Sequence, residues 1–271
     1  LFNTVIVDNS DSTDLKYFLK DFDKINLISS HNLGFGYSNN LGVHNAKTPY
    51  IFILSPDIFF SIESLKILYK EFLSYDNAGV AGPSLYDESN KRRTNSSLSF
   101  LKQKIYRNSF QRNIYKNLNK NLTEGNISCD YIIGCAMLFK KSFFIEIGGF
   151  DESFFIYYED NDICDRIWQS NKMVLEIPSS KMIHLQGKSI KTNFRTNTFL
   201  SISHRVSEYI YLNKNVTKFK LFSIIFINFF DFFQRFLFNL FLLNFKRSYK
   251  NFLRIISILL YITKTYKFIK L

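Results

Sequence analysis

Several motifs that would assign a function at once are absent from this sequence of 271 residues. Its three cysteines, Cys129, Cys135 and Cys164, show neither a C-x-x-C pair nor metal-binding spacing, which is typical of buried thiols in a reducing compartment. Neither a G-x-G-x-x-G sequence nor a P-loop occurs, so mononucleotide sites of those two types are excluded. We recognise no signal peptide in the opening residues, which already have the pattern of a strand.

Acidic residues are scarce in the last quarter of the chain. From Arg205 onward there are 12 Lys/Arg and 2 Asp/Glu, a net charge of +10, whereas the first 204 residues carry 23 and 21, a net of +2. The hydrophobic fraction of 46% supplies ample core. We therefore expect a near-neutral globular domain over residues 1–200 and a basic, Phe-rich helical region over residues 201–271.

Short apolar runs that end in polar loops predict an α/β domain. Strands are expected at Phe2–Val7, Ile25–Ser29, Tyr50–Leu54, Val80–Tyr86, Asp130–Phe139 and Met173–Ile177. Helices are expected between them at 13–22, 38–46, 61–75 and 140–147. The polar, basic segment Asp87–Ile127 has no core pattern and suggests a lid, an acceptor-recognition segment or a disordered loop.

Polar and glycine-rich loops follow the first two expected strands. Ligands of open α/β sheets bind beyond the carboxyl ends of the strands, so Asp8 and Asn9 are placed to hydrogen-bond a base or ribose. The alternative is an Asx turn that closes the strand. In the second loop, Gly34 and Gly36 permit a positive φ or a close backbone approach, which is compatible with a phosphate-facing loop.

Two further residues are candidate metal ligands. Asp57 follows the apolar run YIFIL and would aim a hard carboxylate out of the edge of the sheet. The alternative is a solvated aspartate in a turn set by Pro56. His184 follows a strand beside the same edge, where either a metal or phosphate contact or a structural role would suit it.

The segment Gly148–Trp168, GGFDESFFIYYEDNDICDRIW, carries the densest chemistry. Helical spacing places Glu159, Asp160 and Asp162 near the first turn of a helix. One interpretation is structural: N-capping by carboxylates that complement the helix dipole, with an Asp162–Arg166 i,i+4 ion pair. The other is catalytic, because the preceding aromatic run would shield a carboxylate from water and raise its pKa, as a general base for a hydroxyl nucleophile requires.

The basic tail contains an unusually apolar stretch, Phe219–Phe245, which is long enough to span a bilayer. Asp231, Gln234 and Arg235 interrupt it near the middle, where buried charge would be costly. Basic flanks and a second apolar stretch, Phe252–Ile262, favour an in-plane or hairpin helix on anionic headgroups. The alternative is a helix pair that docks on its own domain or forms a dimer. A nucleic-acid partner is not expected, because the basic residues alternate with long apolar runs rather than with exposed stacking aromatics.

Taken together, these segments resemble the inverting GT-A glycosyltransferases of family 2, and most closely the rhamnosyltransferase-like bacterial enzymes that build surface polysaccharides. VDNSDSTD is similar to the nucleotide-binding strand and loop of that family, and NLGFGYSNNLGVHNA to its N-x-G-[FY]-[GA]-x-x-x-N-x-G segment. LSPD resembles the L-N-P-D form of the D-x-D metal motif. The longest match, GCAMLFKKSFFIEIGGFDESFFIYYEDNDICDRI, resembles the signature that ends in G-G-F-D-E-x-F-F-x-Y-x-E-D-x-D-L-x-x-R.

The resemblance implies a role for each matching position. Asp160 would be the base that removes the proton of the acceptor hydroxyl, and Glu159 and Asp162 would support and orient it. Asp57, with His184, would hold a Mg²⁺ or Mn²⁺ ion that bridges the diphosphate of the sugar nucleotide. The implied nucleotide-binding residues are Asp8, Asn9, Asn32, Gly34 and Asn39.

The resemblance also implies a fold and an activity. The fold would be a Rossmann-like GT-A mixed sheet with a C-terminal helical membrane-associating extension, and it would be N-terminally truncated, because the family opens with one further strand and helix. The activity would be inverting transfer of a sugar, with rhamnose the expected one, from a nucleotide-diphosphate donor to a lipid-linked or polysaccharide acceptor. This step of cell-surface polysaccharide synthesis would occur at the cytoplasmic face of the cell membrane. The alternative is an inactive remnant that acts as a membrane-bound binding protein.

Overall fold

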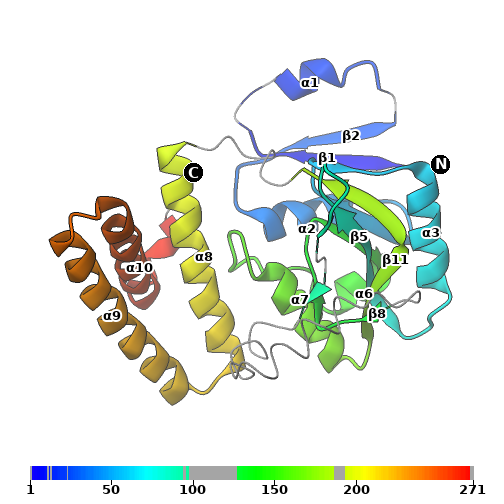
Figure 1. The fold of residues 1–271 in the computed structure, drawn as a ribbon. Coiled ribbons are helices and arrows are strands. Elements are labelled where there is room, and N and C mark those ends of the chain that lie inside the picture. The colour runs from blue at the N-terminus through cyan, green and yellow to red at the C-terminus, as the bar shows by residue number, and fades with distance from the viewer. Residues whose placement is uncertain are drawn as a thin grey trace.

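A computed structural model describes residues 2–93, 96–97, 127–185 and 193–268, apart from residues 11, 13 and 23. The polar excursion expected over 87–127 therefore lies largely outside the described residues. The described chain forms an α/β unit followed by three long helices (Figure 1).

The main sheet has seven strands and is mixed. Its path runs through β3 (Tyr50–Leu54), β10 (Ala136–Lys140), β5 (Ala78–Tyr86), β11 (Met173–His184) and β4 (Ile58–Phe59), with β6 (Arg92–Arg93) beside β5 and β8 (Ile127–Ser128) beside β11. β5 and β11 run parallel, whereas β10 is antiparallel to both β3 and β5. This sheet confirms the expected mixed α/β fold class.

Helices cover both faces of the main sheet, because alternate side chains of a strand point to opposite faces. Met137 and Phe139 of β10 lie in a core with residues of α2, α6 and α7, whereas Ala136 and Leu138 lie in a second core with residues of α3. The helices of this unit are α1 (Asp14–Phe18), α2 (Phe35–Asn45), α3 (Ile62–Leu73), α6 (Lys141–Glu146) and α7 (Glu159–Gln169). The unit is thus a three-layer sandwich, and just after β3 the Ser55 N–H donates to the carbonyl of Cys135 at 2.8 Å.

Two smaller sheets accompany the main one. β1 (Thr4–Asp8) pairs in parallel with β2 (Ile25–Ser29), and β7 (Ser96–Ser97) pairs with β9 (Tyr131–Ile132). Within the described ranges, no strand pairing joins the β1–β2 sheet to the main sheet. Helix α2 connects them instead: the Asn9 side-chain amide donates to Ser38 Oγ of α2 at 2.6 Å.

Most expected strands are confirmed, with two differences. The strand expected to end at Ile177 continues to His184, because a register shift between Ile177 and Lys181 accommodates Pro178 without ending the pairing with β5. The run expected as one strand over 130–139 splits into β9 and β10 around Gly134, whose N–H donates to a carboxylate of α7.

The tail forms α8 (Phe194–Asn215), α9 (Lys218–Phe241), α10 (Phe245–Thr263) and a short 3₁₀ helix (Thr265–Phe268). Helix α8 lies between the α9–α10 hairpin and the α/β unit (Figure 1). Tyr209, Leu221, Phe232 and Ile258 are buried in the core that these three helices share. In the described part of the chain, α9 alone is long and apolar enough to cross a membrane, by length and composition only.

Candidate active site

Two consecutive tyrosines form the approach to α7. Tyr157 and Tyr158 have φ values of 72° and 69°, in the left-handed region that favours glycine. Such strain persists only where the surroundings enforce it, and it concentrates at functional sites. Tyr158 packs against Tyr211 of α8, and His204 of α8 packs against both strained tyrosine rings, with centroids 5.1 and 5.4 Å away. The strained turn leads directly into the first turn of α7.

Asp160, in that first turn, is held by three hydrogen bonds. The backbone N–H of Gly134 donates to Oδ2 at 3.2 Å. The backbone N–H and side-chain amide of Asn161 donate to Oδ1 at 2.8 and 3.0 Å. Burial nevertheless raises the pKa of Asp160, because the loss of water outweighs these bonds. The direction is the one expected of a carboxylate that acts as a general base.

Glu159 is 5% exposed, and its Oε2 has no hydrogen-bond partner within the described chain. Burial, and then the charge of Asp160, raises the pKa of Glu159 well above its usual range. Both effects favour the protonated, neutral form of Glu159.

Asp162 makes the contacts of the structural alternative. Its Oδ2 accepts a hydrogen bond from Arg166 Nε at 2.9 Å, which confirms the expected i,i+4 pair, and its Oδ1 pairs with Lys214 of α8. The expected N-capping by a carboxylate is not seen, since Tyr158 occupies the N-cap without a side-chain bond. A role for Asp162 in orienting the base stays a prediction.

Asp57 and His184, the two predicted metal ligands, lie together. Asp57 is 5% exposed, and its Oδ2 lies 3.5 Å from Nε2 of His184. On the other side of the ring, Nδ1 of His184 lies 3.8 Å from Cys135 Sγ. Burial, then the charges of Asp160 and Asp57, raises the pKa of Cys135 to about 12. Cys135 is therefore a neutral thiol within electrostatic range of both carboxylates.

The residues around Asp57 fit a divalent cation. Asp57 Oδ1 is buried and has no hydrogen-bond partner among the described residues, a costly state for a carboxylate unless a cation binds there. The residues that the structure describes contain no group of three or more His, Cys, Asp or Glu side chains that could hold a metal ion. Mg²⁺ commonly takes one or two protein ligands and completes its coordination with water and substrate phosphates. Asp57 supplies a carboxylate for such a shared site, and Nε2 of His184 lies beside it.

Two predicted nucleotide contacts lie at the end of β1. Asp8 Oδ1 accepts a hydrogen bond from the N–H of Ser10 at 2.9 Å, the Asx turn expected as the alternative. The amide of Asn9 donates to Ser38, but Asn9 Oδ1 is buried with no partner in the described residues. Asn9 thus keeps an acceptor for a ligand donor, whereas Asp8 is at least partly used by its own loop.

The other predicted nucleotide contacts belong to the loop and first turns of α2. Gly34 has a φ of 110°, and a Cβ there would lie 2.5 Å from the carbonyl oxygen of Phe155. That carbonyl accepts a hydrogen bond from Phe35 N–H at 2.8 Å, so the close approach is between two backbone segments. The Asn39 amide donates to the Phe35 carbonyl at 2.8 Å, and Asn32 is half-buried in the loop. Gly34 and Asn39 thus make contacts with their own chain, and their roles in nucleotide binding stay predictions.

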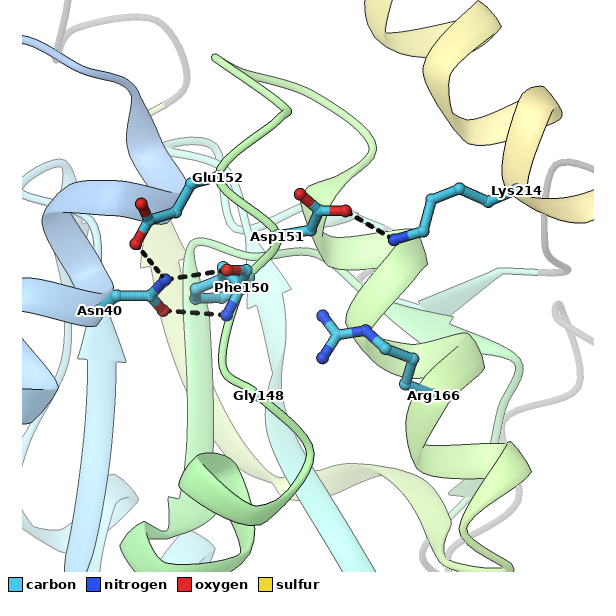
Figure 2. A pocket seen from close by; sticks show the side chains of 7 residues that line it. All are labelled: Asn40, Gly148, Phe150, Asp151, Glu152, Arg166 and Lys214. Carbon is cyan, nitrogen blue, oxygen red and sulfur yellow. Dashed lines mark hydrogen bonds and ion pairs between the residues drawn. The ribbon is translucent and has the colours of Figure 1, made fainter.

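Asn40, which sequence reasoning did not single out, fixes the loop before α7. Its amide donates to the Phe150 carbonyl at 2.8 Å and to Glu152 Oε1 at 3.0 Å, and its Oδ1 accepts from Phe150 N–H at 2.9 Å (Figure 2). A cavity of about 410 Å³ opens beside these bonds, lined also by Arg166 and Lys214. None of the predicted site residues lines this cavity, but Arg166 and Lys214, which do, both pair with Asp162.

Helix α8 also supports the site in ways that the sequence does not signal. Ser207 Oγ donates to the carbonyl of Ile156 at 2.9 Å, the Tyr211 hydroxyl donates to Asp165, and Lys214 pairs with carboxylates of α7 and of the loop before it. Each contact joins positions at least 46 residues apart, so no local pattern could have indicated it.

Comparisons with known proteins agree with this architecture. A family model described as Glycosyl transferase family 2 matches residues 1–148, and one described as the N-terminal domain of galactosyltransferase matches residues 118–188. Rhamnosyltransferase WbbL of Escherichia coli (strain K12) is 27% identical over 192 residues, which cover 68% of this chain and 72% of WbbL.

A second relative and a solved structure extend the comparison. N-acetylglucosaminyl-diphospho-decaprenol L-rhamnosyltransferase of Mycobacterium tuberculosis is 33% identical over 82 residues, 30% of this chain and only 26% of that protein. The fold is similar to that of GalNAc-T7, solved with UDP, GalNAc and Mn²⁺, at a TM-score of 0.53 and 14% identity over 77% of this chain and 41% of the other.

Proposed function

The chain belongs to glycosyl transferase family 2, and from that premise we propose that it moves a sugar from a nucleoside-diphosphate donor to an acceptor hydroxyl with inversion at the anomeric carbon. The similarity to two rhamnosyltransferases supports rhamnose as the sugar. The name of the mycobacterial relative supports a lipid-diphosphate-linked acceptor, and a polysaccharide acceptor is the related alternative.

One observation carries the proposal: two carboxylates with different surroundings lie around one thiol, Cys135. Asp57 has a buried, unpartnered oxygen beside His184, which suits a cation. Asp160 has a raised pKa and firm hydrogen bonds, which suit a base that must be both ionised and basic. The two environments separate a cation-binding role from a proton-accepting role.

In the proposed step, the oxygen of the acceptor hydroxyl bonds to the anomeric carbon while the bond from that carbon to the β-phosphate oxygen breaks. Asp160 takes the hydroxyl proton, preferably at Oδ2, which accepts one hydrogen bond where Oδ1 accepts two. The nucleoside diphosphate leaves with the electron pair. A Mg²⁺ or Mn²⁺ ion bound by Asp57 and His184 would neutralise the charge on that leaving group.

A thermal-shift titration with Mn²⁺ and dTDP, UDP or GDP tests the donor site. A nucleotide at about 100 times its Kd stabilises the folded state by about 2.7 kcal/mol, which raises the midpoint by roughly 5–10 °C for a protein of this size. We expect such a metal-dependent rise with one nucleotide and its loss in Asp57→Asn. Asp21→Asn, which changes an exposed aspartate, is the matched control and should respond like the wild type.

The outcomes are distinct. A shift that persists in Asp57→Asn would remove Asp57 from the metal site. A folded protein that responds to no nucleotide would overturn the proposed transferase and favour the alternative, an inactive membrane-bound binding protein. With the donor identified, the anomeric configuration of the product, measured by NMR against that of the donor, decides between inversion and retention.

A further inference from the structure

One face of α9 is apolar along the whole helix and is exposed. Its large side chains recur every three or four positions, the spacing of a single helix face. The residues at its two ends, Phe219 and Phe241, are 82% and 84% exposed. Between them lie Phe222, Phe226, Phe230, Phe233 and Leu237, all exposed. We call these seven residues the outer face of α9.

The turn that joins α9 to α10 continues the outer face. Leu242, Leu243 and Phe245 are 56%, 72% and 64% exposed. Exposed apolar surface of this extent marks a membrane or protein interaction site in a folded protein.

The core of the helical region does not use the outer face. Leu221 and Phe232 on the opposite side of α9 are buried against α8 and α10. Arg205 of α8 and Arg254 of α10 hold their guanidinium groups 5.5 and 5.2 Å from the centroid of the Phe232 ring. A bilayer-spanning α9 would carry these charges into the hydrocarbon region, which is costly. A helix that lies flat avoids this cost.

Asp231 and Arg235, the charged residues that interrupt the apolar stretch, do not belong to the outer face. Asp231 and Arg235 are one turn apart, and Arg235 Nε lies 2.8 Å from Asp231 Oδ1. At about 100° per residue, the helix turns this pair toward the side, between the outer face and Phe232. A helix that lies flat on its outer face therefore keeps the ion pair out of the acyl-chain region.

Exposed basic residues stand at both ends of the apolar surface. Lys218 and Lys220 begin α9, and Lys246, Arg247 and Lys250 follow the turn into α10. This combination of an apolar helix face and flanking positive charge complements an interface of acyl chains and anionic headgroups.

We propose that the outer face of α9 and the adjoining turn bind in the plane of an anionic lipid bilayer, with the flanking lysines and arginine on the headgroups. Lipid is the occupant that this charge pattern favours over a second protein. The proposal uses no residue of the candidate active site, so it can be tested independently of sugar transfer.

Vesicle co-sedimentation of the full chain tests the proposal. The wild type should pellet with phosphatidylcholine vesicles that contain roughly 30 mol% phosphatidylglycerol, and should pellet less without that lipid or when salt is raised from about 0.1 to about 0.5 M. Replacing Phe226 and Phe230, a ring pair 4.7 Å apart, by glutamate should weaken partitioning at least about tenfold. The matched control replaces Phe18 and Phe22, on and just after α1, by glutamate. These two exposed rings are also four residues apart, with centroids 6.3 Å from each other, and their replacement should change vesicle binding little.

Three results would overturn the proposal. One is no vesicle binding by the folded wild type, and another is an equal loss in the control pair. The third is resistance of the bound protein to extraction by alkaline carbonate, which would indicate a spanning helix.

Phe226→Trp adds a depth measurement. Lipids brominated at shallow acyl positions should quench the fluorescence of the new tryptophan, whereas the wild-type fluorescence from Trp168, the sole tryptophan, should not change. A concentration-dependent dimer that is lost in the Phe226/Phe230 variant, with no lipid binding, would assign the outer face to a second copy of the chain instead.

Discussion

Replacing Gly34 by alanine should destabilise the fold and impair transfer together. Its φ of 110° and ψ of 168° belong to a region that only glycine populates readily, so a side chain there costs about 1–3 kcal/mol. The added Cβ would also lie 2.5 Å from the carbonyl oxygen and 2.9 Å from the Cα of Phe155, backbone atoms that cannot rotate aside. The 2.8 Å bond from Phe35 N–H to that carbonyl would weaken, at about 0.5–1.5 kcal/mol. We expect a loss of about 2–4 kcal/mol in the free energy of unfolding.

Urea denaturation measures this loss, and Gly42→Ala is the matched control. Gly42 lies inside α2, where a Cβ would meet only Val7 Cγ2, at an ordinary 3.5 Å. That substitution should stabilise the protein by about 0.5–1 kcal/mol. The kcat for sugar transfer should fall in the Gly34 variant alone, because the displaced Phe155 leads into the turn that positions Asp160. A Gly34→Ala protein within about 0.5 kcal/mol of the wild type would refute the reasoning.

Three further predictions concern the start of α7. Asp160→Asn should lower kcat by a factor of about 10²–10⁴ but should keep the nucleotide-induced thermal shift. In the wild type, kcat should rise with pH as Asp160 loses its proton, at a pH above the usual range for an aspartate. An Asp160→Asn variant with near-normal kcat would show that another residue is the base. Because the pKa of Glu159 is raised on folding, the folded state binds its proton more tightly, and unfolding free energy should fall as pH rises above the ordinary value of 4.5. Glu159→Gln should remove this pH dependence. The free energy of unfolding of the variant minus that of the wild type, measured in urea, should therefore be more positive at about pH 8 than at about pH 5. An equal difference at the two pH values would contradict a buried Glu159 with a raised pKa. Lys214→Met should lower the free energy of unfolding, measured in urea, by about 1–2 kcal/mol, and by less at high salt. The loss is limited because Lys214 is partly exposed and Arg166 still pairs with Asp162. A loss that does not depend on salt would indicate lost packing instead.

Local patterns predicted the secondary structure well where the signal itself is local. The runs INLIS and YIFIL became β2 and β3 with the expected ends, and the helix expected at 61–75 became α3, which Ser61 caps by accepting a hydrogen bond from Ser64 N–H. The predicted end of β11 at Ile177 was too early, because a register shift within a long strand pair is set by the partner strand rather than by the residues themselves.

The candidate site was likewise predicted where the signal is local and missed where it depends on tertiary packing. The acidic helix start and the approach of His184 to Asp57 followed from strand ends and helix spacing. The roles of Asn40 and of Lys214 did not, since their partners come from segments brought together only by tertiary packing. The positive φ and the close backbone approach expected at Gly34 are confirmed, but no motif could specify that the neighbouring segment is Phe155, and the ligand role of Gly34 stays a prediction.

The anchoring of α8 to the loop before α7 and to the hairpin has a geometric consequence for acceptor choice. Helix α8 contacts both partners along the same stretch: Ser207 and Tyr211 bond Ile156 and Asp165, and the Tyr209 ring packs on Tyr261 of α10 at 5.4 Å. With α9 on a membrane, as proposed above, these contacts would hold Asp160 at a fixed height above the lipid. Acceptors would then be selected by how far their reactive hydroxyl stands from the surface, and a substitution at Tyr209 that loosens α8 from α10 should broaden the range of acceptor lengths that are used.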